Sequence, residues 1–405
     1  MEIYTQILLW AFGLAVLLGI VANKTNFCTM GAVSDVVNMG DTGRMRAWMF
    51  ALGVAILGVM LLEHFGFVDM SLTQSGETSN PPYRSPMFSW PRHLLGGIMF
   101  GIGMTLASGC GNKSLLRFGG GNLKSIFVLL TIGIGAYLMV FTDFGHIVFL
   151  SWMEPANIDL SVSGIESQGL GSIVSHFTGT DSLSTGHVIA AVLGTLMLLW
   201  ALKSTDFRGN WDHMTAGLVI GLIIVAAWWV TTGAMGQNLL EEAEMMDDRP
   251  YGLGAQAFTF VQPTAHFLMW LKSGFSNTYV TFALVAAAGV ITGSLLYSAL
   301  SRTFRIEWFS GWKDFFNHII GAFLMGVGGV LAIGCTIGQA VTGASTLALG
   351  SFLTFAAIVF GSALTMKIQY YQMVYEDEAT FMKALVAGLA DMRLLPNSLR
   401  KLDKV

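Results

Sequence analysis

The sequence predicts an all-α polytopic membrane protein with about nine transmembrane helices, an inverted internal repeat and interrupted half-helices. Composition is the first observation behind this prediction, since 54% of the 405 residues are hydrophobic and only 11% are charged, against about 25% charged residues in soluble domains. The second is a mean hydropathy of +0.63. The third is that apolar residues fall in long runs almost free of charge, and not in the alternating pattern of a membrane β-barrel. A soluble enzyme is therefore not expected.

The charge balance argues against nucleic acid as a partner. The 21 Lys and Arg residues and the 25 Asp and Glu residues give a net charge of −4, and no basic run is present that would neutralise phosphates. The lipid bilayer is the partner that the composition predicts.

Nine apolar stretches define the expected crossings. Each approaches or reaches the roughly 17 to 25 residues that span the hydrocarbon core. No Lys or Arg precedes the first stretch and no small-residue cleavage site follows it, so we expect a retained span and not a signal peptide. The predicted spans are 4–22, 46–66, 93–110, 123–142, 187–203, 214–234, 276–300, 318–335 and 346–367.

Basic residues predict the orientation of these spans, because Lys and Arg accumulate in short cytoplasmic loops. With the N-terminus outside and the C-terminus inside, all but four of the 21 Lys and Arg residues fall in inner segments. The predicted outer stretch 143–186 contains neither residue type. Another outer stretch, 236–250, carries an acidic run that we interpret as a solvated loop: Glu241, Glu242, Glu244, Asp247 and Asp248.

Two segments that lie 225 residues apart share a pattern of residues. They belong to the third and eighth predicted spans, and this odd offset places the two copies in opposite orientations across the membrane. Transporters built from inverted repeats bind their substrate near the midplane, where interrupted helices meet. The aligned pairs are His93/His318, Gly96/Gly321, Gly101/Gly326, Gly103/Gly328, Gly109/Gly334 and Cys110/Cys335.

Glycine beside cysteine predicts that both copies are interrupted. Gly109 and Gly334 each precede an aligned cysteine, and glycine lets a chain leave helical geometry. Non-helical backbone at membrane depth persists only where protein or a water-filled cavity satisfies its polar groups. We therefore expect these two segments to line a path, whereas we interpret Gly97 and Gly101 as positions of close helix packing.

The chain has three cysteines, Cys28, Cys110 and Cys335, and their odd number argues against a disulfide framework. A single buried cysteine is usually an inert small hydrophobe, but two of them hold the same place in the repeat. Cys28 follows the first span and opens a short apolar stretch, which is compatible with a half-helix that enters the bilayer. We expect the three thiols to lie along one route.

A row of thiols favours a soft guest. The neutral S–H group is a weak, polarizable donor that suits a sulfur atom, whereas a thiolate would bind Cu(I); the methionines show no ligand spacing from the cysteines. Helix N-termini would add N–H donors for an anion. No nucleophile–base pair or phosphate loop is present, so no catalytic residue, metal site or cofactor is expected. The expected binding residues beside the cysteines and their glycines are Asn112, Lys113, Thr336 and Gln339, although Lys113 also fits an inner-surface anchor.

These motifs resemble the YeeE/YedE family of sulfur-transport membrane proteins. The resemblance rests on Asn26-Phe-Cys-Thr-Met-Gly-Ala, Ser108-Gly-Cys-Gly-Asn and Ile333-Gly-Cys-Thr-Ile-Gly-Gln, in this order. It implies a bacterial inner-membrane protein with a central hourglass-shaped path that takes up thiosulfate, with Cys28, Cys110 and Cys335 as the substrate contacts. It also implies a small cytoplasmic sulfur-carrier protein as a partner. Other relatives are associated with selenium compounds.

Two other hypotheses remain open beside sulfur-anion transport. One is a membrane thiol-redox enzyme or sulfur-transferase that forms cysteine persulfides, and the other is a transporter of selenium compounds or Cu(I). The expected organisation is a first membrane repeat at 1–145, an outer loop at 146–186, a second membrane repeat at 187–370 with an outer loop at 236–275, and a cytoplasmic amphipathic tail at 371–405.

Overall fold

The computed structural model describes residues 2–246, 249–400 and 402, and it is built almost entirely from helices. Within these residues, nine helical segments are long and apolar enough to cross a membrane, and each overlaps one predicted span. The all-α polytopic class is therefore confirmed. The principal helices are α1 (Glu2–Lys24), α3 (Gly43–His64), α4 (Trp90–Leu106), α6 (Lys124–Phe141), α9 (Ser182–Leu202), α11 (Trp211–Thr232), α14 (Phe282–Leu300), α15 (Trp312–Leu331) and α16 (Leu349–Tyr375).

Shorter elements fill the connections. One antiparallel pair of two-residue strands, β1 (Met87–Phe88) and β2 (Ile158–Asp159), ties two of these connections together. Of the predicted acidic run, Asp247 and Asp248 lie outside the described residues. The short helices are α2 (Thr29–Ser34), α5 (Gly111–Gly119), α7 (Ser151–Met153), α8 (Leu170–Thr178), α10 (Thr205–Gly209), α12 (Ala234–Glu244), α13 (Gln262–Lys272) and α17 (Phe381–Asp391), with π-helical turns at Asp35–Met39, His146–Leu150 and Gly338–Gly343.

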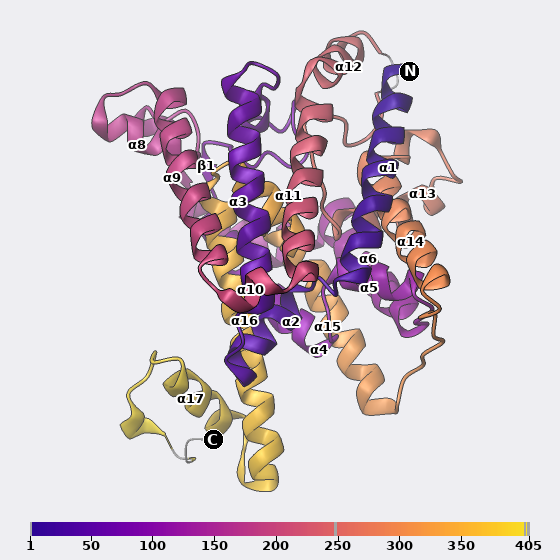
Figure 1. Cartoon of the computed structure of the whole chain (residues 1–405), viewed down its shortest axis with the longest axis vertical. Helices are drawn as coiled ribbons and strands as arrows, with labels where there is room; N and C mark the ends of the chain where they lie inside the picture. Colours follow the sequence, from indigo (N-terminus) through magenta and orange to yellow (C-terminus); the bar gives the residue numbers. More distant parts are fainter. Residues whose placement is uncertain (1, 247–248, 401, 403–405) are drawn as a thin grey trace.

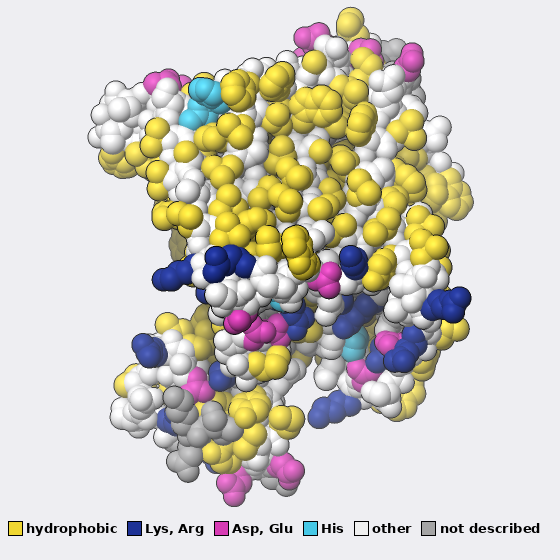
Figure 2. All heavy atoms as spheres, viewed as in Figure 1, with side chains coloured by type: hydrophobic (Ala, Val, Ile, Leu, Met, Phe, Trp, Pro, Cys, Tyr) yellow, Lys and Arg dark blue, Asp and Glu magenta, His cyan; other side chains and the backbone are white. Residues whose placement is uncertain are grey.

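The faces of the outer helices are apolar, as a bilayer requires. In Figure 1, α9, α3, α11 and α1 stand side by side, and neighbouring members of this row pack against one another. Leu9, Leu17, Leu196 and Leu222 on these helices are exposed, and Figure 2 shows a broad hydrophobic surface here with Lys and Arg gathered along its lower border. Exposed leucine is stable in lipid, whereas cations prefer the headgroup region.

The two copies of the repeat cross at glycines. A Cβ atom at Gly96 would lie 2.8 Å from the carbonyl oxygen of Gly328, and one at Gly103 would lie 2.5 Å from that of Gly321. Because the repeat aligns Gly96 with Gly321 and Gly103 with Gly328, each contact is the image of the other. This reciprocity is the packing that a two-fold axis between inverted copies produces.

The neighbouring helices follow the same symmetry. The third span, α4, packs against α16, while α15 packs against α6. On the periphery, α1 packs against α14 and α11 packs against α3. Exchanging α4 with α15, α6 with α16, α1 with α11 and α3 with α14 converts each contact into another that is present, so the repeat extends over eight of the long helices.

The C-terminal part forms a small cluster beyond the main body. The lower end of α16 projects from the bundle and α17 lies beside it (Figure 1). Asp391 is nearly buried, accepts hydrogen bonds from Tyr371 and Arg400, and lies 3.7 Å from the Lys367 ammonium nitrogen. This ionic cluster holds the tail against α16.

Candidate functional site

The paired helices α4 and α15 both break at the aligned glycines. After Ala107 and Ala332 the chain turns through positive φ at Ser108 (56°) and Ile333 (62°). A β-branched residue rarely adopts this left-handed conformation, and such strain is found mostly at functional sites. The interruption expected beside the cysteines is therefore present in both copies, and its strain makes the two turns candidates for function.

Each cysteine stands at the residue before a new helix. Cys28 and Cys110 are the N-cap residues of α2 and α5, and Cys335 precedes the turn that continues into Gly338–Gly343. Their carbonyl oxygens accept the first helical hydrogen bonds, from the amides of Ala32, Ser114 and Gln339. All three thiols are buried and unpaired with one another. They are therefore available for chemistry and face neither lipid nor bulk water.

The other two cysteines belong to the surroundings of Cys110. Cys28 and Cys335 both lie within electrostatic range of the Cys110 sulfur, and the Thr336 side chain is next to it. Thr336 directly follows Cys335, so the second copy of the repeat contributes a residue to the surroundings of Cys110 in the first copy. Among the described residues, no group of three His, Cys, Asp or Glu side chains has the arrangement of a metal site.

Cationic and amide groups accompany Cys110. The Lys113 ammonium donates a hydrogen bond to the Asn26 side-chain oxygen, which joins α5 to the segment just before Cys28. A Cβ atom at Gly109 would lie 3.0 Å from the Lys113 side chain and 3.7 Å from the Arg117 guanidinium. The first copy thus places positive charge beside its cysteine.

Neutral donors surround Cys335. Its sulfur accepts from the backbone N–H groups of Phe260 at 3.3 Å and Gly338 at 3.4 Å, and the Thr259 hydroxyl lies 3.9 Å away. The sulfur is therefore oriented by the segment 253–261, which is buried almost throughout although the sequence placed it in an outer loop. No apolar run of spanning length marks this segment, and only its uncharged, aromatic composition could have identified it.

Several buried polar atoms beside the cysteines have no hydrogen-bond partner among the described residues. Gln339 uses its side-chain nitrogen to donate to the Ala332 oxygen at 2.7 Å but leaves its own oxygen unpaired. Buried polar groups are nearly always paired, so such a group needs an explanation, and a polar guest would provide one. The unpaired atoms are Thr29 Oγ1, Asn112 Oδ1 and Gln339 Oε1, and Thr336 Oγ1 has only the Cys110 sulfur beside it.

Cavities border both helix breaks. One of about 220 Å³ lies beside Ser108 and is lined by Arg117 and Lys124. The other, of about 100 Å³, lies beside Gly334 and is lined by Thr259 and Arg92. Both breaks therefore adjoin hollow space, which is mainly polar beside Ser108 and mainly apolar beside Gly334, where Val261 and Val330 contribute to the lining.

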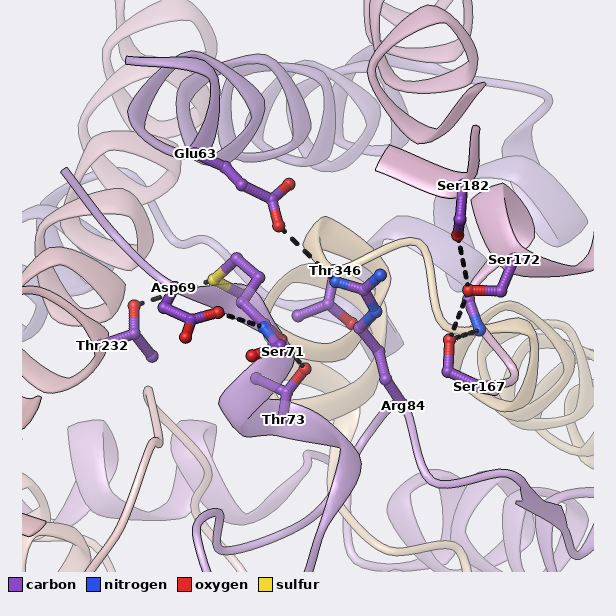
Figure 3. A network of polar contacts seen from close by, with 12 residues as sticks. Glu63, Asp69, Ser71, Thr73, Arg84, Ser167, Ser172, Ser182, Thr232 and Thr346 are labelled. Atoms are coloured by element: carbon purple, nitrogen blue, oxygen red, sulfur yellow. Dashed lines mark hydrogen bonds and ion pairs between the residues drawn. The ribbon is translucent and has the colours of Figure 1, made fainter. Parts of the chain in front are cut away.

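A network near the Cys335 end fixes the segment between α3 and α4 (Figure 3). The Arg84 guanidinium extends toward Glu63 of α3, with a closest nitrogen–oxygen distance of 3.8 Å, and the Arg84 amide donates to the Thr73 oxygen. Burial lowers the pKa of Arg84, while Glu63 and Asp69 oppose this effect. Asp69 in turn accepts from the Ser71 amide at 2.8 Å. These contacts hold the residues next to Arg84 in place.

Helices that cross the membrane as an inverted repeat, with broken helices, buried polar groups and cavities beside the breaks, define a polytopic membrane protein of the transporter class. The chain belongs to the sulphur transport family, the YeeE/YedE proteins, because the family model matches residues 24–364. This membership confirms the family that the three cysteine motifs indicated.

Three relatives have curated names. The thiosulfate transporter TsuA of Spirochaeta thermophila is 27% identical over 350 residues, which cover 85% of this chain and 94% of the relative. The thiosulfate transporter TsuA of Escherichia coli is 24% identical over 373 residues, with 85% and 90% covered. The probable transporter YedE of Salmonella typhimurium is 25% identical over 148 residues, with 35% and 33% covered. Sulfur-anion transport is thus the activity to which the family and the relatives point.

Proposed function

We propose that this protein takes up thiosulfate, or a closely related sulfur anion, along a path on which Cys28, Cys110 and Cys335 contact the substrate. One observation carries the proposal: three buried thiols each stand at the start of a helix beside unpaired polar atoms, and Cys28 and Cys335 are within electrostatic range of Cys110. The two relatives named thiosulfate transporters support the choice of substrate.

The chemistry of the site matches both ends of thiosulfate. A thiol is a weak, polarizable donor and suits the terminal sulfur, while hydroxyl and amide groups such as Thr336, Asn112 and Gln339 suit the oxygens. Burying a dianion without compensation is prohibitively unfavourable, and Lys113 supplies opposite charge beside Cys110. The chain leaves helical geometry at Gly109 and Gly334, and this break in the helix exposes these groups.

The proposal includes an orientation in the bacterial inner membrane. The N-terminus lies outside and the C-terminus in the cytoplasm, so that the cation-rich border faces the cytoplasm. A negative-inside membrane potential opposes the inward movement of a dianion by about 2.3 kcal/mol per charge per 100 mV. A small cytoplasmic sulfur-carrier protein that consumes the product would offset this opposing term.

A second candidate is a sulfur-transferase in which the Cys335 sulfur attacks the terminal sulfur of thiosulfate. The sulfur–sulfur bond of thiosulfate breaks, sulfite leaves with the thiol proton, and a persulfide remains on Cys335. The observation in its favour is that three donors, two of them backbone N–H groups, converge on this sulfur and would stabilise negative charge there. It predicts a covalent sulfur adduct on the purified protein after exposure to thiosulfate, detectable by mass spectrometry. A transporter without group transfer predicts an unchanged mass.

The test of transport uses a host that lacks other routes for thiosulfate and sulfate uptake. Cys110→Ala and Cys335→Ala should each abolish growth on thiosulfate and uptake of the labelled ion, with normal amounts of protein in the membrane. Thr365→Val is the matched control, because it removes a buried hydroxyl that bonds only within its own helix. Wild-type uptake by either cysteine variant would reject the proposed path.

A further inference from the structure

Tyr83 brings an unpartnered hydroxyl to the Cys335 end of the site. The residue comes from the segment that joins α3 and α4, is only 4% exposed, and packs its ring edge-on against Trp228. Its hydroxyl oxygen has no hydrogen-bond partner in the described part of the chain. The oxygen nevertheless lies beside the turn after Cys335, 3.5 Å from where a Cβ atom of Gly338 would be.

The buried phenol is maintained as a donor. Burial raises the pKa of Tyr83 well above its usual value, and the nearby Cys335 raises it further. The hydroxyl therefore keeps its proton and can donate. Leaving such a group buried and unpaired destabilises a protein, so an arrangement that aims it at Gly338 and Cys335 indicates a ligand that accepts its hydrogen bond.

Thr259 stands on the same turn. A Cβ atom at Gly338 would lie 2.7 Å from the Thr259 hydroxyl oxygen, which is 3.9 Å from the Cys335 sulfur. At this length the contact to sulfur is weak, so the hydroxyl can rotate toward a better acceptor. Two neutral O–H groups thus adjoin the position next to Cys335.

The repeat shows what these hydroxyls replace. The same offset of 225 residues aligns Gly338 with Lys113, the cation beside Cys110. In the second copy a side chain at position 338 would collide with Thr259, and Tyr83 occupies the space beyond. The symmetry is therefore broken at the ligand-binding position itself: one cysteine has an ammonium group as its companion and the other has two hydroxyls.

We propose that Tyr83 and Thr259 donate hydrogen bonds to the oxygen atoms of the transported anion while Cys335 contacts its sulfur. The Cys335 end then selects sulfur anions that carry oxygen, such as thiosulfate, over those without oxygen, such as hydrosulfide, because a hydroxyl prefers an oxygen acceptor. Arg84 acts as a positioning residue, since its contacts with Glu63 and Thr73 hold the neighbouring Tyr83. The inference rests on the proposed function.

The test measures labelled thiosulfate uptake by protein reconstituted in vesicles, with hydrosulfide as a competitor. Tyr83→Phe should raise the KM for thiosulfate about tenfold, the size expected for a lost hydrogen bond to an anion, and leave inhibition by hydrosulfide and the melting temperature unchanged. Thr259→Val should also raise the KM for thiosulfate, whereas Thr259→Ser, which keeps the hydroxyl, should have the wild-type KM. Tyr4→Phe is the matched control, because the Tyr4 hydroxyl donates to the Val280 oxygen at 2.7 Å and should affect stability only.

The outcomes separate the two proposals. An unchanged KM in Tyr83→Phe, with uptake abolished in Cys335→Ala, would overturn the inference and leave the transport function standing. Equal losses of affinity for thiosulfate and hydrosulfide would overturn the selection for oxygen. A lowered melting temperature in Tyr83→Phe would show that the hydroxyl serves the fold instead. Full uptake by Cys335→Ala would reject the proposed function itself.

Discussion

Gly103 and Gly321 face each other across the interface between α4 and α15. A Cβ atom at Gly103 would lie 2.5 Å from the Gly321 carbonyl oxygen, and a Cβ atom at Gly321 would lie 2.6 Å from that of Gly103. Because the obstructing atoms belong to the backbone, a side chain at either position could be accommodated only if a whole helix shifted. This contact sets how closely the two copies of the repeat approach, and the helix breaks lie beyond it.

Gly103→Val is therefore expected to destabilise the protein by about 1–3 kcal/mol, the range for overpacked cores. The melting temperature of the detergent-solubilised protein should fall, and uptake should fall with it. Gly13→Ala is the control, since a Cβ atom at Gly13 meets no atom within 4 Å. Equal melting temperatures for wild type and Gly103→Val would contradict the close approach of α4 and α15.

Lys113→Met should weaken thiosulfate affinity about 10- to 100-fold, the size of a lost hydrogen bond to a charged group. The ammonium group lies at the start of α5 beside Cys110 and bonds Asn26. Concentration dependence of initial uptake measures the effect. The control is Lys24→Met, because the Lys24 side chain is exposed and its ammonium nitrogen makes only a long contact of 4.0 Å with an Asp212 carboxylate oxygen. If both variants behave alike, Lys113 serves as a surface anchor.

Tyr83 should contribute to affinity equally across physiological pH. Its raised pKa means that the phenol is protonated throughout, and its contribution is lost only as pH rises through that elevated value. Free tyrosine titrates near pH 10, so the ratio of KM values for Tyr83→Phe and wild type should stay constant from about pH 6 to pH 9. A ratio that falls toward one by pH 9 would mean that the phenol ionises early and is not shielded.

Arg84→Gln should raise the KM for thiosulfate a few-fold by loosening the segment that carries Tyr83. The effect should be absent in the Tyr83→Phe background, because residues that act through one another are not additive. Arg249→Gln provides the control, since among the described residues the exposed Arg249 donates only to the Glu77 backbone oxygen. Additive losses in the double variant would show that Arg84 acts independently of Tyr83.

Asp391→Asn should release α17 from α16 without affecting transport. The nearly buried carboxylate accepts hydrogen bonds from Tyr371 and Arg400 and pairs with the Lys367 ammonium group. Breaking a buried ion pair typically destabilises a protein by about 3–5 kcal/mol. Limited proteolysis should cut the tail faster in the variant, while uptake stays at the wild-type rate. Reduced uptake at normal expression would place the tail in the transport cycle.

The sequence was sufficient for the spans and the cysteines because their signals are local or repeated. A run of apolar residues identifies a span on its own, and the Gly-Cys pairs at 109–110 and 334–335 stand out because they recur in register. Tyr83 and Thr259 carry no such signal. Each lies in a connection without spanning length, and its proximity to Cys335 arises only when segments far apart in the sequence pack together. The ion pair between Arg84 and Glu63 is equally a product of tertiary structure.

The position of a heavy substrate analogue would test most directly whether the three cysteines contact the transported anion. Selenosulfate, in which selenium replaces the terminal sulfur of thiosulfate, can be located by anomalous diffraction from crystals of the loaded protein. We expect selenium within hydrogen-bonding distance of the Cys335 or Cys110 sulfur, with the oxygens toward the surrounding hydroxyl, amide and ammonium groups. Selenium bound only at sites remote from all three cysteines would contradict this expectation.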